Sequence, residues 1–153
     1  MSDEPFTLDT NILIYSFDLK SDRRHEIAKE IVLRSGFKAC FLTLQAVSEF
    51  YAAVTRKRIM QRSEANRVAN DLLDVFRTVA ASTAAVRQAL ATSAEGQASY
   101  WDALLVATAA EAGCTTILTE DLADGSRLLG VRILNPFAGS ALTPDAAALL
   151  ALD

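Results

Sequence analysis

Short apolar segments alternate along the chain with longer segments in which apolar residues recur at helical spacing. The pattern predicts strands at residues 6–8, 38–43, 78–81, 115–119 and 131–134. It predicts helices that begin near residues 12, 23, 44, 63, 84 and 100. Strands alternating with helices are typical of parallel strands joined by right-handed crossovers, so the pattern predicts a layered α/β domain.

Polar residues precede four of the predicted helices at the positions where helix caps occur. Asn11, Asp22, Thr43 and Thr83 each stand just before an apolar segment of helical period. The side-chain oxygens of Asn, Asp and Thr accept hydrogen bonds from the free N–H groups of a first helical turn. We therefore expect these four residues to cap their helices.

The C-terminal segment departs from the alternating pattern. Residues 138–143 are expected to form a connector, and Pro144 then opens a short helix rich in Ala and Leu. We expect one domain over residues 1–137 and a tail over residues 138–153. The sequence leaves open whether this tail packs on the domain or on a partner.

Composition and charge narrow the class of protein. A chain of 153 residues, 51% of them hydrophobic, fits one globular domain that buries a sizeable core. The net charge of −4 does not indicate a nucleic-acid binder, although bound cations or local basic patches can reverse the field. Cys40 and Cys114 lie in apolar contexts and are expected as free thiols. With no signal sequence or membrane-spanning apolar run, we expect a cytoplasmic protein.

Four carboxylates occupy positions that the α/β pattern brings towards one edge of the sheet. Asp9 ends the first strand, Asp121 follows the strand at 115–119, and Asp102 lies in a first helical turn. Glu49 lies in the middle of the third helix, which could run near that edge. Singly, each has a simpler explanation as a cap, a dipole-favoured residue, a solvent-facing residue or a loop residue.

Taken together, converging carboxylates would repel one another, and a divalent cation would relieve that cost. Oxygen ligands favour Mg²⁺ or Mn²⁺. The single His25 and the two dispersed cysteines offer no zinc site.

Basic residues follow the third helix. Arg56, Lys57 and Arg58 form a run at its end, and Arg62 lies nearby. Cations at a helix C-terminus are favoured by the helix dipole, which is a sufficient account of this run. Contact with nucleic acid is the alternative.

Several short motifs together resemble those of the PIN-domain ribonucleases. They are Asp9-Thr10-Asn11, Val47-Ser48-Glu49-Phe50, Tyr100-Trp101-Asp102-Ala103-Leu104, Ile117-Leu118-Thr119-Glu120-Asp121-Leu122 and Ile133-Leu134-Asn135-Pro136-Phe137. Each motif alone is weak, but their order and positions are specific, and the similarity covers about residues 6–137.

The resemblance implies a three-layer fold with a central parallel sheet of four to five strands, and Mg²⁺- or Mn²⁺-dependent cleavage of RNA. It implies Asp9, Glu49, Asp102 and Asp121 as metal-binding catalytic acids. Glu120 and Asp124 are rival candidates for the fourth acid, and we prefer Asp121. By the same resemblance, Asn11 and Thr119 would support the acids by hydrogen bonding.

The small size of the chain resembles that of a VapC-type toxin, which implies an antitoxin partner and a homodimer. One alternative is a catalytically silent PIN-like module that binds proteins. Another is a phosphatase with Asp9 as nucleophile. That chemistry usually needs a second Asp two residues on, where this chain has Asn11.

Overall fold

A computed structural model of the chain describes residues 4–152. Its main sheet has six strands in the order β3-β2-β1-β4-β6-β5. The strands are β1 (Phe6–Leu8), β2 (Cys40–Thr43), β3 (Arg77–Val79), β4 (Thr116–Leu118), β5 (Arg127–Leu128) and β6 (Val131–Leu134). The first five in this order are parallel, and β5 pairs antiparallel with β6 at the edge. The parallel part agrees with the prediction, whereas the two-residue β5 was not predicted.

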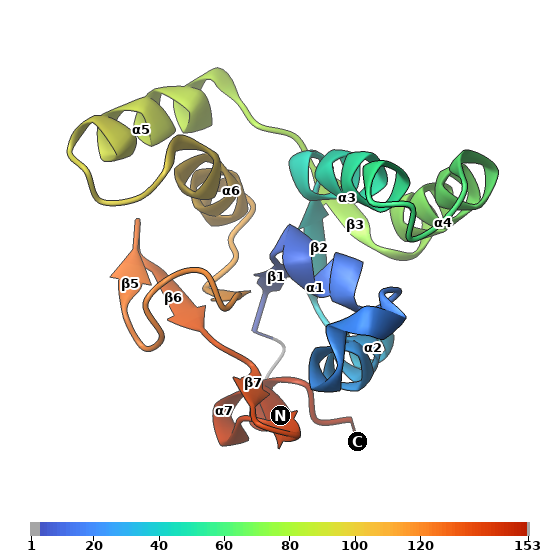
Figure 1. Ribbon diagram of the computed structural model, residues 1–153. Helices are drawn as coiled ribbons and strands as arrows, with labels where there is room; N and C mark the ends of the chain where they lie inside the picture. The colour runs from blue at the N-terminus through green and yellow to red at the C-terminus, as the bar shows by residue number, and fades with distance from the viewer. Residues whose placement is uncertain (1–3, 153) are drawn as a thin grey trace.

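Helices cover both faces of this sheet (Figure 1). They are α1 (Thr10–Tyr15), α2 (Arg23–Ser35), α3 (Leu44–Arg56), α4 (Arg62–Val75), α5 (Thr83–Ala94), α6 (Tyr100–Glu111) and α7 (Pro144–Leu149), with a 3-10 turn η1 (Leu19–Ser21). Phe6, Leu8 and Leu118 pack into the cluster formed with α1 to α4. Ile117 and Ile133 pack instead with α6. Because successive strand residues point to opposite faces, the fold has the expected three layers.

The predicted helix caps are only partly confirmed. Thr43 accepts a hydrogen bond from the Ala46 amide, as expected of a cap. Asp22 occupies an N-cap position without a side-chain cap bond. Asn11 and Thr83 already lie inside their helices, and Asp9 and Ser82 are the cap residues there. Each of these two helices therefore begins earlier than its apolar pattern indicates, because a polar residue, Thr10 or Thr83, is its first helical residue.

The C-terminal segment packs against the rest of the chain. Where a connector was expected, β7 (Phe137–Ala138) and β8 (Ala141–Leu142) form an antiparallel hairpin. Leu149 and Leu150 then join the core that α1 to α4 form. The Lys38 Nζ atom donates a hydrogen bond to the Ala151 carbonyl at 3.1 Å. This last segment therefore closes one end of the domain (Figure 1).

The cysteines and the length of the helices were also considered in the sequence. Cys40 and Cys114 are buried free thiols, as predicted. Within residues 4–152, no helix is long and apolar enough to cross a membrane.

Candidate active site

Asp9 lies where β1 passes into α1 and is only 7% exposed. Its backbone amide donates to the Leu118 carbonyl of β4 at 3.0 Å, which continues the pairing of these two parallel strands. The Thr119 hydroxyl, directly after β4, donates to Asp9 Oδ2 at 2.7 Å. The two neighbouring strand ends therefore hold the Asp9 carboxylate, with Thr119 as its hydrogen-bond donor.

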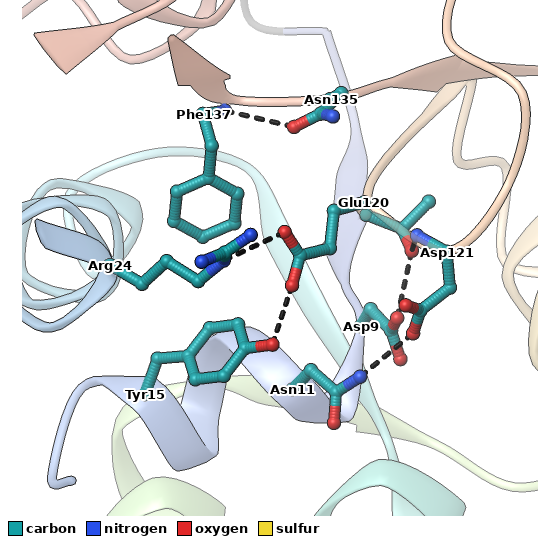
Figure 2. A network of polar contacts seen from close by, with 9 residues as sticks. Asp9, Asn11, Tyr15, Arg24, Glu120, Asp121, Asn135 and Phe137 are labelled. Carbon is teal, nitrogen blue, oxygen red and sulfur yellow. Dashed lines mark hydrogen bonds and ion pairs between the residues drawn. The ribbon is translucent and has the colours of Figure 1, made fainter. Parts of the chain in front are cut away.

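Asp121 joins this arrangement through two contacts. Asn11 Nδ2 donates to Asp121 Oδ2 at 2.8 Å, and the Asp121 amide donates to Thr119 Oγ1 at 3.1 Å. Figure 2 shows Asp9, Asn11 and Asp121 pointing towards one another. Asn11 therefore orients a carboxylate that lies 110 positions away in the sequence, instead of capping its own helix.

The charges at this site act on one another. Burial is the main cause that raises the pKa of Asp9 to about 7 from its usual 3.8. The negative charges of Asp121 and Asp102 raise this pKa further, whereas the hydrogen bond from Thr119 opposes the rise. Asp102 acts from the first turn of α6, where its amide donates to the Ser99 hydroxyl at 3.2 Å. Three of the four predicted acids thus interact at the carboxyl end of β1.

Glu49 is exposed on α3 and is tied to the site indirectly. Gln45 Nε2 donates to Glu49 Oε1 at 2.7 Å and to the Trp101 carbonyl at 3.2 Å. One amide therefore joins α3 to the first turn of α6, next to Asp102. Glu49 is not among the charges that raise the pKa of Asp9. The sequence analysis missed Gln45, although its i, i+4 spacing from Glu49 was the available signal.

The chemistry of this donor set fits a hard divalent cation, since every candidate ligand is an oxygen. Within residues 4–152, however, no group of three or more His, Cys, Asp or Glu side chains is arranged to hold a metal ion. Asp121 and Glu49 are each bound to an amide, from Asn11 and Gln45. Gln45 Oε1 is buried and has no hydrogen-bond partner among the described residues, which adds one more unpaired oxygen beside Glu49. Each of these amides engages one oxygen of its carboxylate, Asp121 Oδ2 or Glu49 Oε1, so the acids must draw closer together, without losing these contacts, to complete a coordination sphere.

Glu120 points away from Asp9 and belongs to a separate network (Figure 2). Its Oε1 atom accepts a hydrogen bond from the Tyr15 hydroxyl at 2.5 Å, and its Oε2 pairs with Arg24 Nε at 2.9 Å. The Arg24 guanidinium lies 5.8 Å from the Tyr15 ring centroid and 5.9 Å from that of Phe137. We call Tyr15, Arg24, Glu120 and Phe137 the Arg24 cluster.

The third rival acid, Asp124, accepts a hydrogen bond from the Asn135 amide at 2.9 Å. Of the three acids that compete for the fourth position, only Asp121 contacts the residues around Asp9.

The basic residues predicted to contact RNA lie at the end of α3 and the start of α4. Arg56, Lys57, Arg58 and Arg62 are exposed, and none forms an ion pair within residues 4–152. Arg58 has a φ of 56° where the chain leaves α3. With Arg62 it borders a surface hollow of about 800 Å³. We call these four residues the α3–α4 basic patch, and no described contact links it to the acids.

A model of the PIN domain family matches residues 6–123. The chain belongs to the PIN domain family. PIN domains are nucleases, so the chain has the fold of a family of hydrolases. A search of curated proteins finds no match.

Three solved structures of the PIN fold resemble this chain. One is VapC20 from Mycobacterium tuberculosis, a sarcin-ricin loop cleaving toxin. It has 18% identity and a TM-score of 0.60, over 76% of this chain and 91% of that one. DNA-bound VapBC from Salmonella typhimurium has 18% identity and a TM-score of 0.59, over 85% and 96%. VapBC2 from Rickettsia felis, bound to a promoter DNA fragment, has 13% identity and a TM-score of 0.58, over 84% and 96%. At these identities the similarity establishes a shared fold.

Proposed function

We propose that this PIN domain is a metal-dependent endoribonuclease in which Asp9, Glu49, Asp102 and Asp121 hold Mg²⁺ or Mn²⁺. The observation that carries the proposal is the buried Asp9 carboxylate, whose pKa is raised by burial and by the carboxylates of Asp121, after β4, and Asp102, in the first turn of α6. A site built in this way favours a bound cation, because the cation would neutralise charges that otherwise repel one another.

When bound, the cation would lower the pKa of a water molecule and stabilise negative charge on the phosphate. The protein's own residues prepare the site for it. Thr119 holds Asp9 in one orientation, and Asn11 does the same for Asp121. Gln45 keeps Glu49 close to the first turn of α6. Fixed ligands lose less conformational freedom on binding, so these amides and the hydroxyl act as positioning groups.

We further propose that the protein is the toxin of a toxin–antitoxin pair. The support is the similarity to the toxin VapC20 and to two VapBC complexes. An antitoxin or a second copy of the chain would find exposed apolar side chains on or beside the first helices, including Phe17, Leu33, Phe37 and Tyr51. Expression alone should arrest bacterial growth, and expression with the neighbouring open reading frame should restore it.

The direct test compares Asp9→Asn and Asp102→Asn with the parent protein on single-stranded RNA in Mg²⁺. We expect each variant to lose about a hundredfold or more in cleavage rate, roughly 2.7 kcal/mol of transition-state stabilisation. Asp71→Asn is the matched control, because Asp71 is exposed on α4 and its described contact is with Arg67, away from the acidic site. Cleavage by both variants at the parental rate would overturn the mechanism.

The alternative function is a silent PIN-like module that acts by binding proteins. Calorimetric titration with Mn²⁺ distinguishes the two, because an active site must bind the ion and a silent module need not. The phosphatase alternative is not favoured, since Asn11, in the place of its second Asp, is engaged with Asp121.

A further inference from the structure

A polar hollow of about 760 Å³ lies beside the acidic site, on the other side of Glu120. Its walls include Asp22, Arg23, Arg24, Glu120, Asn135 and Phe137. Glu120 and Asp121 are consecutive residues, and Figure 2 shows both side chains extending towards α1, Glu120 to Tyr15 and Asp121 to Asn11. The hollow and the acidic site are therefore neighbours, because Glu120 lines the one and the next residue, Asp121, belongs to the other.

The Arg24 side chain is held in this hollow by contacts at its Nε atom and its guanidinium face, and its Nη1 and Nη2 atoms remain free to bind a ligand. Its Nε atom pairs with Glu120, and its guanidinium lies against the rings of Tyr15 and Phe137. The side chain nevertheless remains 52% exposed. No hydrogen bond within residues 4–152 uses its Nη1 or Nη2 atoms. A guanidinium fixed through Nε presents its two Nη groups as a fork, the geometry that binds a phosphate at two points.

The four charged side chains around this fork balance in formal charge, two arginines against two carboxylates. Arg24 and Glu120 compensate each other in formal charge. Arg23 is exposed and forms no ion pair in the described part of the chain. Asp22, also exposed on this rim, adds a negative charge that acts on Arg24, and water and salt screen it as they screen the charge of Arg23. An anion that contacts both arginines would therefore gain one bidentate contact and one nearby free cation.

We propose that this hollow binds a backbone phosphate of single-stranded RNA, next to the phosphate that is cleaved at Asp9. Arg24 is the two-point anchor and Arg23 is the second cation. The proposal rests on the proposed function and adds the place where the substrate strand leaves the acidic site. Because the Glu120 pair and the two rings already order Arg24, binding costs little of the side-chain entropy that a free arginine loses.

The test measures RNA affinity separately from cleavage. A fluorescein-labelled, single-stranded oligoribonucleotide is titrated with full-length protein carrying Asp9→Asn, which prevents cleavage, and anisotropy is recorded at several salt concentrations. Adding Arg24→Ala should weaken binding about tenfold and reduce the salt slope by about 0.7, the value for one phosphate contact to a single strand. Arg23→Ala should weaken binding about threefold, and Asp22→Asn should tighten it about twofold.

Two controls keep this result interpretable. Arg87→Ala removes an exposed arginine of α5 and should leave the affinity unchanged. Arg24→Lys retains the charge but not the fork, so its affinity should lie between those of the parent and Arg24→Ala. Arg23 makes no described side-chain contact, so Arg23→Ala tests the hollow even if the Arg24 variants unfold at a lower temperature.

Parental affinity and salt slope in both Arg23→Ala and Arg24→Ala would overturn the proposal. Parental RNA binding combined with loss of binding to the antitoxin would also overturn it, and would identify the hollow as a protein interface. The proposed function is judged separately, from cleavage by the protein with Asp9 intact. If that protein does not cleave RNA but Arg24→Ala still weakens binding, the nuclease proposal fails and the phosphate site stands.

Discussion

The acidic site and the Arg24 cluster place carboxylates in opposite electrostatic surroundings. At the acidic site, Asp9, Asp102 and Asp121 face one another, and the pKa of Asp9 rises to about 7. In the Arg24 cluster, the Glu120 carboxylate accepts hydrogen bonds from the Arg24 guanidinium and the Tyr15 hydroxyl. Glu120 and Asp121 are adjacent in the sequence. Asp121 nevertheless lies among other negative charges, whereas the charge of Glu120 is balanced by Arg24. Repulsion between carboxylates therefore remains at the acidic site, where a cation is proposed to bind. It is absent at Glu120, whose contacts with Tyr15 and Arg24 hold this segment against α1 and α2.

The strongest test of this contrast exchanges each adjacent acid for its amide. Asp121→Asn should reduce the rate of RNA cleavage about a hundredfold, because it removes a proposed metal ligand. Glu120→Gln should reduce it less than about fivefold, since its amide oxygen can still accept the Tyr15 hydrogen bond. Cleavage assays at saturating Mg²⁺ measure both. A larger loss in Glu120→Gln than in Asp121→Asn would reverse the assignment of the fourth acid.

The second prediction concerns stability and pH. In the folded state the pKa of Asp9 is about 7, above its usual 3.8, so folding takes up a proton between these values. The contribution of Asp9 to stability is therefore greatest below about pH 4 and is lost as the pH rises through about 7. Asp9→Asn should raise the free energy of unfolding at pH 8, without divalent cations, by on the order of 2 kcal/mol.

Urea denaturation at pH 4.5 and pH 8 measures this difference, which should be smaller at pH 4.5. Adding Mn²⁺ at pH 8 should stabilise the parent and leave Asp9→Asn unchanged, because only the parent has the proposed ligand. A destabilised Asp9→Asn protein at pH 8 would contradict the view that the carboxylate cluster is strained.

Thr119→Val sharpens the account of how Asp9 is held. The variant keeps the shape of the side chain but removes the hydroxyl that donates to Asp9 and accepts from the Asp121 amide. Loss of such a supporting contact typically lowers metal affinity or activity about 10- to 100-fold. Mn²⁺ calorimetry provides the measurement, with Thr115→Val, outside the acidic site, as the control. Unchanged affinity would mean that Asp9 needs no orientation by Thr119.

Tyr15→Phe tests the Arg24 cluster, in which the charge of Glu120 is balanced. It removes one donor to Glu120 but leaves the Arg24 pair in place. The free energy of unfolding should fall by about 1 kcal/mol, the usual net value of one hydrogen bond. Chemical denaturation measures this loss. RNA cleavage should change little, and a large loss of activity would show that the Arg24 cluster also orients the acidic site.

The smallest effect is expected at the α3–α4 basic patch. Its members have no described ion pairs and are not held in place as Arg24 is. Arg56→Ala combined with Arg58→Ala should weaken RNA binding about twofold, as expected for diffuse attraction. Anisotropy titrations check this value. A loss larger than that of Arg24→Ala would place the main RNA contact on the patch instead.

Local signals in the sequence were sufficient for the α/β class of the fold and its parallel strands, and they marked the candidate acids. Apolar runs marked the five parallel strands, and the residues after those runs marked Asp9 and Asp121. The elements that were missed are β5 and the β7–β8 hairpin, each built from two-residue strands. Strands this short carry no measurable periodicity, so only pairing with a neighbour defines them.

The sequence by itself determined where the strands end and that Asp9 and Asp121 follow two of them. Strand ends and helix starts can be located from residues close together in the sequence. Only the tertiary structure decided which partners Glu120 and Asp121 contact. Their partners, Tyr15, Arg24 and Asn11, come from helices that lie 96 to 110 positions away in the sequence. Side-chain direction depends on such distant contacts, and neither composition nor spacing contains that information.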